Sequence, residues 1–169
     1  KGVENTIENV SRIAREGTIT GTTVGGATDT TAVTQEGATE VITINSTEYT
    51  AAAVGQRVTI SGKSNSARLK LLTVEIYPED IVQDAELSIN GKADGTWILS
   101  GDGTVTGDPG ASAMYDFVLT LVIPENKTTA KKSAIYKITN GGTVNSESFV
   151  VLQTEGAKNY AVPTISAFA

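Results

Sequence analysis

Catalytic and metal-binding chemistry in this chain is limited by two residue types that it does not contain. The 169 residues include no His and no Cys. Their absence removes Ser-His-Asp triads, thiol nucleophiles, and zinc sites built from imidazole or thiolate. The 19 Asp and Glu residues are too numerous and too scattered for the sequence to single out an acid–base pair. We therefore expect a protein that is not an enzyme, with no catalytic residues and no cofactor or metal.

Two acidic stretches are the remaining candidates for binding a cation. Ser100–Gly110 holds Asp102 and Asp108 among glycines, and Glu79–Asp84 holds a second group of carboxylates. Calcium prefers carboxylates and carbonyls gathered in such loops, but the spacing of an EF-hand is absent. Asp beside Gly is also typical of plain turns, and we favour that interpretation for both stretches.

Glycan binding by a β-protein usually relies on exposed aromatic rings that stack on sugars. Aromatic residues make up only 5% of this chain, which is thin for a dedicated polysaccharide binder. The single Trp, Trp97, is expected to pack in the core between two sheets. Four tyrosines near expected strand ends or loops are the candidates for a weak glycan platform: Tyr49, Tyr77, Tyr115 and Tyr160.

Segments rich in β-branched residues must position any such site, and three of them dominate the second half of the chain. In Asp116–Ile123, alternating apolar side chains predict one buried face. Ser133–Thr139 alternates in the same way, and Phe149–Gln153 is a continuous apolar run. Because polar turns separate the three segments, we expect an antiparallel meander at the centre of a β-sandwich.

Further strands are expected at sandwich spacing, between turns rich in Gly and Asn. About eight short strands over residues 38–156 predict an all-β fold, an immunoglobulin-like antiparallel β-sandwich, with a barrel as the alternative. Besides the three segments above, the expected strands are Val41–Ile44, Arg57–Ser61, Arg68–Ile76, Ala85–Ile89 and Thr96–Ser100.

Residues 1–37 are expected to form an N-terminal extension or docking segment outside this sandwich. Apolar residues at a spacing of three to four, with Glu and Arg between them, predict a short amphipathic helix ending at Gly17. A strand is the alternative. A helix of this length is not stable alone, so it must dock on its own domain or on a neighbour. The residues expected to dock are Val3, Ile7, Val10 and Ile13.

The Thr- and Gly-rich stretch that follows the expected helix predicts two short strands around a glycine-rich turn. These strands are Thr18–Thr20 and Thr31–Thr34. The motif Gly17–Gly21 resembles Gly103–Gly107. Two interpretations stay open: residues 1–37 are a degenerate copy of a preceding repeat, or the echo is a coincidence in a Thr/Gly-biased sequence.

The C-terminal tail, residues 157–169, is apolar and carries no charge after Lys158. A free apolar tail is a liability in a soluble monomer. We expect the tail to add an edge strand to this domain or, alternatively, to pair with another chain. Its expected docking residues are Val162, Ile165 and Phe168.

Charge and length exclude some partners. The net charge of −6 and a pI near 4.7 predict repulsion of phosphate backbones, so we expect no nucleic-acid partner. No apolar run approaches the ~20 residues needed to span a bilayer, so we expect no membrane insertion. The sequence starts at Lys1, and we interpret the chain as a mature or trimmed product.

Residues from about Thr39 to Gly156 resemble a known family. The resemblance is carried by Val58–Ser66 with Leu69, by Trp97, by Val122–Asn126, by Lys131–Ile138, and by Val150–Gln153 before Gly156. The chain is similar to the BACON and BACON-like immunoglobulin-like domains of Bacteroidetes surface proteins and their phages. In that family Gln usually stands directly before a small residue, whereas Thr154 and Glu155 intervene here. The resemblance implies a seven- or eight-stranded sandwich on a cell surface or virion, outside the cell.

Two hypotheses for the function follow. The first is a non-enzymatic structural or display protein of a surface assembly, either a phage capsid, head-fibre or tail component or part of a bacterial envelope. Its termini would dock on neighbouring subunits of a multi-copy or homo-oligomeric assembly. The second, which the family resemblance implies, is a carbohydrate- or mucin-binding adhesion module of the Bacteroidetes cell surface or of a phage surface.

Overall fold

The computed structural model describes residues 7–77, 81–89, 98–99, 102–108, 110–141 and 146–157. These residues form strands and connecting segments and no helix. The described part of the chain therefore contains no helix that is long and apolar enough to cross a membrane. The expected core residue Trp97, the acidic pair Glu79–Asp80 and the C-terminal docking residues lie outside these ranges.

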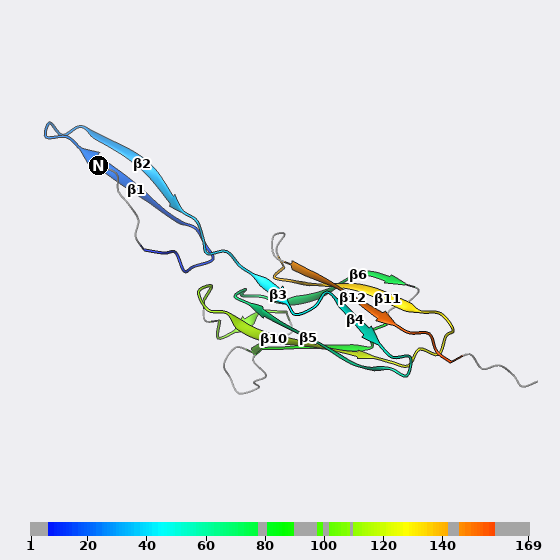
Figure 1. Ribbon diagram of the computed structural model, residues 1–169. Helices are drawn as coiled ribbons and strands as arrows, with labels where there is room; N and C mark the ends of the chain where they lie inside the picture. The colour runs from blue at the N-terminus through cyan, green and yellow to red at the C-terminus, as the bar shows by residue number, and fades with distance from the viewer. Residues whose placement is uncertain are drawn as a thin grey trace, which may run out of the picture.

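Two four-stranded sheets form a β-sandwich (Figure 1). Their orders are β3-β5-β10-β7 and β4-β12-β11-β6. In the immunoglobulin fold the corresponding sheets are ABED and CFG, with β4 here added beside the last strand. The predicted fold class is thus confirmed, and the chain does not form the alternative barrel. The strands are β3 Ile42–Ile44, β4 Glu48–Ala51, β5 Gln56–Ser64, β6 Lys70–Tyr77, β7 Asp84–Ile89, β10 Tyr115–Ile123, β11 Lys132–Thr139 and β12 Ser146–Gln153.

Two smaller sheets lie outside the sandwich sheets. Strands β1 (Arg15–Thr22) and β2 (Thr28–Gln35) pair over their full length into a hairpin that projects from one end of the sandwich (Figure 1). Strands β8 (Ile98–Leu99) and β9 (Val105–Thr106) form the second small sheet. The described chain ends after β12, at the end of the sandwich that lies opposite the hairpin.

The hydrophobic core lies between the two sandwich sheets and follows the predicted alternation. Phe117, Leu119 and Leu121 of β10 are completely buried. On the facing sheet, Tyr136 of β11 pairs with Phe149 of β12, and their ring centroids are 5.7 Å apart. Burying one such side chain stabilises the fold by roughly 1.5–3 kcal/mol. The core, rather than the Thr-rich surface, therefore holds the sandwich together.

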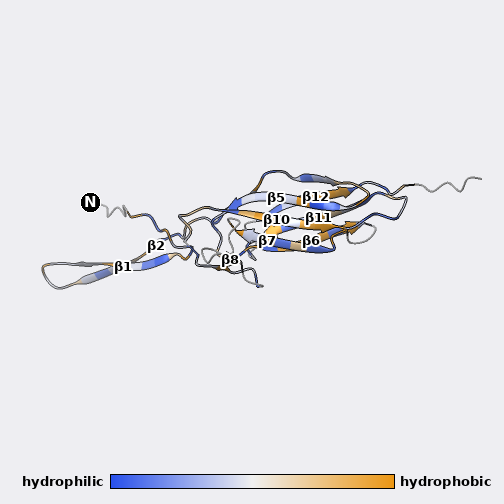
Figure 2. Ribbon diagram, turned by 90° about the horizontal axis from the view of Figure 1, so that it is seen from below, coloured by the Kyte–Doolittle hydropathy of each residue, from blue (hydrophilic) through white to orange (hydrophobic). Residues whose placement is uncertain are grey.

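The β1–β2 hairpin lacks such a core. Every residue of the two strands is exposed except Gln35, which is half-buried. Its apolar residues are few, and Figure 2 shows the hairpin mostly in white and blue, whereas orange stretches lie on the sandwich strands. Both strands are extended because Thr has high β-propensity and because Gly26, at a φ of 82°, allows the turn between them.

The predicted N-terminal helix is wrong over residues 7–17. Residues 7–14 are irregular, and β1 begins at Arg15. The alternative prediction of a strand therefore holds only for the last residues of this segment. The side chain of Asn9 explains the difference, because it donates to the Ile13 carbonyl (2.9 Å) and accepts from the Ser11 amide (3.1 Å). These side-chain bonds replace the backbone bonds that a helix would need. The two short strands predicted after Gly17 are present as parts of β1 and β2.

The predicted meander is also wrong, because β10 belongs to one sheet while β11 and β12 pair in the other. The connection between β10 and β11 crosses the sandwich instead of reversing within a sheet. Asn126 fixes this crossing: its backbone amide donates to the Ala53 carbonyl (2.7 Å), and its side chain donates to the carbonyls of Ala130 and Thr154. Alternation could not reveal the difference, since a strand with one buried face fits either arrangement.

The sandwich is not purely antiparallel, which is a further correction. Strand β4, which the sequence did not predict, pairs in parallel with β12. Glu48 lies opposite Val150, and Ala51 lies opposite Gln153. The buried Gln153 side chain closes this contact by donating to the carbonyls of Pro124 (2.7 Å) and Ala52 (3.3 Å).

Candidate functional site

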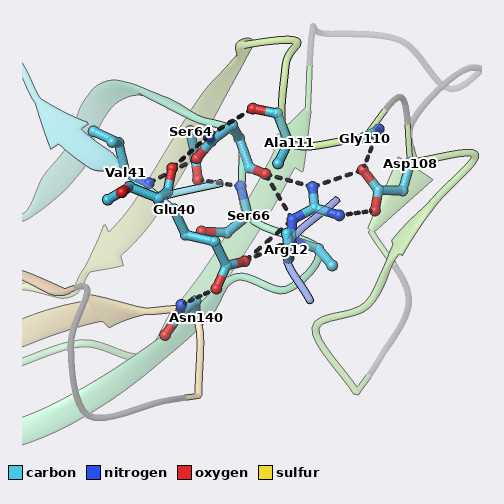
Figure 3. A network of polar contacts seen from close by, with 12 residues as sticks. Arg12, Glu40, Val41, Ser64, Ser66, Asp108, Gly110, Ala111 and Asn140 are labelled. Carbon is cyan, nitrogen blue, oxygen red and sulfur yellow. Dashed lines mark hydrogen bonds and ion pairs between the residues drawn. The ribbon is translucent and has the colours of Figure 1, made fainter. Parts of the chain in front are cut away.

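Arg12 is the centre of a polar network at the base of the hairpin (Figure 3). Its guanidinium donates to both carboxylate oxygens of Asp108, in the loop after β9, with an Nη2–Oδ1 distance of 2.9 Å. It also donates to the Asn65 carbonyl at the end of β5, and its Nε lies 3.3 Å from Glu40 Oε1. A bidentate Arg–carboxylate pair gives strength and a fixed direction. Arg12 therefore ties the N-terminal segment to the sandwich.

Electrostatics favour the charged form of this pair. The hydrogen bond from Arg12 is the main cause that lowers the pKa of Asp108, and the Gly110 amide adds to it. The hydrogen bond to Asp108 likewise raises the pKa of Arg12, although partial burial opposes it. Both groups therefore stay ionised at neutral pH, and the contact persists as an ion pair.

Asn65 and Glu40 connect Arg12 to three further segments. The Asn65 side chain accepts from the Val41 amide (2.6 Å) and donates to the carbonyls of Thr39 (3.0 Å) and Ala111 (2.8 Å). Glu40 accepts from the Asn140 side chain (2.7 Å) in the turn after β11. The network thus joins the linker that leaves the hairpin to three loops at one end of the sandwich.

Asn9 closes the base of the hairpin itself and is only 4% exposed. Its side-chain amide donates to the Glu36 carbonyl (3.0 Å), which lies just past β2. Gly37 stands where a Cβ would lie 2.4 Å from the Arg12 carbonyl oxygen, so no larger residue fits there without a shift. The Ala38 amide donates to the Ser11 carbonyl (2.8 Å). The segment before β1 and the segment after β2 are therefore clamped together.

The three tyrosines of the predicted glycan platform that the structure describes do not come together. Tyr115 is 1% exposed, and its hydroxyl donates to the Ser66 carbonyl, so its place in the platform was wrong. Tyr49 of β4 is half-buried against Phe149, and it lies on the sheet edge opposite to β6. Tyr77 of β6 is 68% exposed. Tyr160 lies outside the described residues.

The predicted docking residues that are described all face solvent. Ile7, Val10 and Ile13 are exposed, with Ile13 reaching 77%. They come from the irregular segment before β1 and share no helical face. The remaining docking residues, Val3, Val162, Ile165 and Phe168, lie outside the described residues, and docking stays a prediction.

The acidic loop contains turns in the form that the sequence favoured. Asp102 accepts from the amide and the hydroxyl of Thr104, both at 2.9 Å, and Asp108 accepts from the Gly110 amide at 3.0 Å. Among the residues that the structure describes, no three acidic side chains gather where a metal ion could be held. Asp108 serves the Arg12 ion pair instead.

A groove of about 400 Å³ lies on the second sheet, at the end of the sandwich away from the hairpin. The ends of β4, β6 and β12 and the start of β11 line it. Tyr77 and Leu152 supply apolar surface, and Lys131 and Lys132 supply the charge of the described lining. Such a surface suits a small apolar group with a nearby negative charge.

Sequence reasoning missed the residues at the base of the hairpin. Arg12 counted only as a polar position of the expected helix, and Asn9 was not among the predicted site residues. Asn65 did belong to the Ser-Asn-Ser motif on which the family resemblance depends, so the sequence pointed to one member of the network. Ion pairs between segments far apart in sequence cannot be read from spacing, because Arg12 and Asp108 are 96 positions apart.

Fold and site together define an immunoglobulin-like β-sandwich with a clamped, projecting hairpin. No family model matches the chain, and no curated protein matches it. Similar solved structures include the NMR structure of a protein from Bacteroides thetaiotaomicron, which is 16% identical in sequence and has a TM-score of 0.32. The match covers 68% of this chain and 85% of that chain. Two endo-fucoidan hydrolases of glycoside hydrolase family 107 share 9% and 10% identity over 83% and 86% of this chain, each with a TM-score of 0.33. This chain spans only 22% and 19% of those enzymes, and likeness at this level carries no argument about function.

Proposed function

We propose that this protein is a non-enzymatic structural or display component of a surface assembly. In this proposal the sandwich is the displayed body, and the hairpin docks it on a neighbouring subunit. One observation carries the proposal: the β1–β2 hairpin is exposed on both faces and pairs with no other described strand. The setting, on a virion or a bacterial envelope, is the one that the BACON resemblance implies.

An exposed hairpin of this length needs an explanation. A two-stranded sheet is at best marginally stable alone in water. Its outer edges also present unpaired backbone N–H and C=O groups, which are a template for pairing with another chain. Natural proteins usually protect such edges with charges or proline, yet between Gly17 and Thr34 the hairpin contains no proline and only one charged residue, Asp29. Contact with a neighbour would cover these edges.

The base of the hairpin supports a docking role, because it holds the arm in one direction. Arg12 and Asn9 make several directed contacts at the junction between hairpin and sandwich. A segment held in its bound conformation loses less entropy on association, so its affinity is higher. Hydrogen bonds of this number would have little purpose on a linker that only had to be flexible.

The test is the size of the 169-residue chain in solution, measured by sedimentation velocity over a series of concentrations. We expect the intact chain to form assemblies and a variant that lacks residues 15–35 to lose them. Circular dichroism checks that the sandwich still folds, and removal of residues 158–169 tests the other terminus separately. Assembly that is unchanged after both deletions would overturn the proposal.

Glycan binding is a second candidate, and the groove beside Tyr77 favours it. Among the described tyrosines of the predicted platform, only Tyr77 is strongly exposed, and hydroxyl groups of Thr50 and Ser133 lie in the same groove. An aromatic face next to hydrogen-bonding groups suits a sugar ring. A glycan array with the intact chain and with Tyr77→Ala tests this candidate. Binding that a free sugar competes away, and that the substitution abolishes, would support it.

A further inference from the structure

We propose that the tip of the hairpin of one copy inserts into the Tyr77 groove of a second copy, which gives head-to-tail assembly. The inference rests on the proposed function, because it names the surface on which the hairpin docks. The tip is defined as residues 23–27, and the Tyr77 groove is the groove on the second sheet described above.

The tip is built to present one apolar side chain. The Thr23 amide donates to the Ala27 carbonyl (2.8 Å), and the Gly26 amide donates to the Thr23 carbonyl (2.9 Å). The Thr23 hydroxyl oxygen also accepts from the Ala27 amide (3.1 Å). These bonds close the turn and leave Val24 fully exposed, the most exposed large apolar residue among those described. An apolar side chain at the end of a projecting hairpin is unfavourable in a monomer, because it stays exposed to water.

The Tyr77 groove offers the complementary surface. Its exposed apolar area comes from Leu152 and the ring of Tyr77. The hydroxyl groups of Thr50 and Ser133 can donate hydrogen bonds to, or accept them from, the backbone of a turn. The side chain of Val24 is small compared with a groove volume of about 400 Å³. Apolar contact inside a polar rim is the usual composition of a protein interface.

Charge selects the same pairing. Asp29 is the only charged residue of the hairpin between Gly17 and Thr34, and it lies two positions beyond the tip. Among the described residues that line the groove, the only charged ones are Lys131 and Lys132, and both are positive. In this pairing the single negative charge near the tip, Asp29, would meet two positive charges in the groove of the second copy, in a chain whose overall charge is negative. Such complementarity fixes orientation and speeds association more than it adds affinity.

The placement of the two surfaces makes the occupant a second copy. Hairpin and groove lie at opposite ends of the molecule, so the tip cannot reach the groove of its own chain (Figure 1). A contact between unlike surfaces of identical chains is heterologous. It closes into a ring if the rotation between copies permits, and otherwise it extends into a linear array. Either form would display many sandwiches in one orientation.

A charge-swap experiment tests the inference by sedimentation velocity on the intact chain. Lys131→Glu together with Lys132→Glu should weaken self-association about tenfold, because attraction at the groove becomes repulsion. Adding Asp29→Lys to that variant should restore most of the loss. Val24→Asp alone should also weaken association about tenfold, as expected for a central apolar anchor. The control, Lys63→Glu with Lys70→Glu, makes the same charge change outside the groove and should leave association unchanged.

The outcomes separate the inference from the proposed function. If deleting residues 15–35 abolishes assembly while the lysine reversal and Val24→Asp have no effect, the hairpin docks elsewhere and the inference is wrong, but the proposed function stands. If neither the deletion nor the substitutions change assembly, both are wrong. If the lysine reversal abolishes glycan binding and leaves assembly intact, the groove is a sugar site and the inference is overturned. A chain that stays monomeric at every concentration overturns it as well.

Discussion

The β1–β2 hairpin and the β10 strand show two ways in which this chain makes extended structure. Both have an unbroken antiparallel register over at least eight residues. In β10 every second side chain is a large apolar residue that is buried, whereas the hairpin strands are rich in Thr and all their residues except the half-buried Gln35 are exposed. High β-propensity is therefore enough to make a segment extended, whereas alternating apolar residues are needed for the strand to contribute to the stability of the fold.

The strongest test of this comparison replaces one side chain in each region. Leu119→Ala in β10 should lower the free energy of unfolding by about 2–5 kcal/mol, because it leaves a cavity in the core. The matched change in the hairpin, Ile19→Ala, should alter it by less than about 0.5 kcal/mol. Urea unfolding measures both. Equal losses would mean that the hairpin is part of the cooperative unit, and the distinction between the regions would fail.

The buried Tyr115 lies at the end of the sandwich that meets the hairpin, and it should make the stability of the sandwich depend on pH. Burial raises the pKa of Tyr115 to about 12. The unfolded phenol loses its proton near pH 10, so the stabilisation is complete below pH 10 and is lost as the pH rises toward 12. The loss should reach roughly 2 kcal/mol, and Tyr115→Phe should remove this pH dependence. Urea unfolding at several alkaline pH values, compared between the two proteins, isolates this one tyrosine.

Arg12→Ala tests whether the hairpin base can loosen while the sandwich stays intact. The substitution removes the Arg12 hydrogen bonds to the Asn65 carbonyl and to Asp108, and we expect a global cost of about 1 kcal/mol. Amide hydrogen exchange over residues 9–14 should accelerate at least tenfold, with β10 amides unchanged. Arg15→Ala is the control, since it removes an exposed arginine nearby. Faster exchange in β10 would show that the base and the core unfold together.

The smallest expected effect is the acid sensitivity of the same base. The hydrogen bond from Arg12 lowers the pKa of Asp108, so its stabilisation is present above about pH 4 and is lost as the pH falls through the lower pKa of the folded state. The NMR signal of the Arg12 Nε–H group should shift over that acidic range. Asp108→Asn should remove the shift, and a shift that persists in this variant would assign it to another acid.

The sequence predicts most strands of the sandwich, but not which sheet each strand belongs to. Period-2 alternation located β10 and β11, because large apolar residues at every second position are typical of a strand with one buried face. It could not decide which sheet holds each strand, since that choice depends on Asn126 and its contacts with distant carbonyls. The short strand β4 escaped because its sequence, Glu-Tyr-Thr-Ala, has a single large apolar residue.

The candidate site was harder to foresee than the fold, for a physical reason. A glycan platform needs aromatic rings that are exposed to solvent. Tyr115 is buried instead, and the local sequence did not indicate this. The network around Arg12 depends on segments that only the folded chain brings together. The Tyr77 groove likewise forms where four strand ends meet. The residues next to Tyr77 and Lys132 in the sequence give no indication that these two side chains line one groove.

The parallel pairing of β4 with β12 has a mechanical consequence. If tension pulls the chain from its N-terminal side and from the end of β12, these two strands are drawn past each other along their length. The bonds between Glu48–Ala51 and Val150–Gln153 are then loaded together instead of one after another, as would happen on peeling. In a body attached at both ends, the β4–β12 pair would therefore carry its load in shear, and its shear strength would contribute to how long the body stays folded under tension.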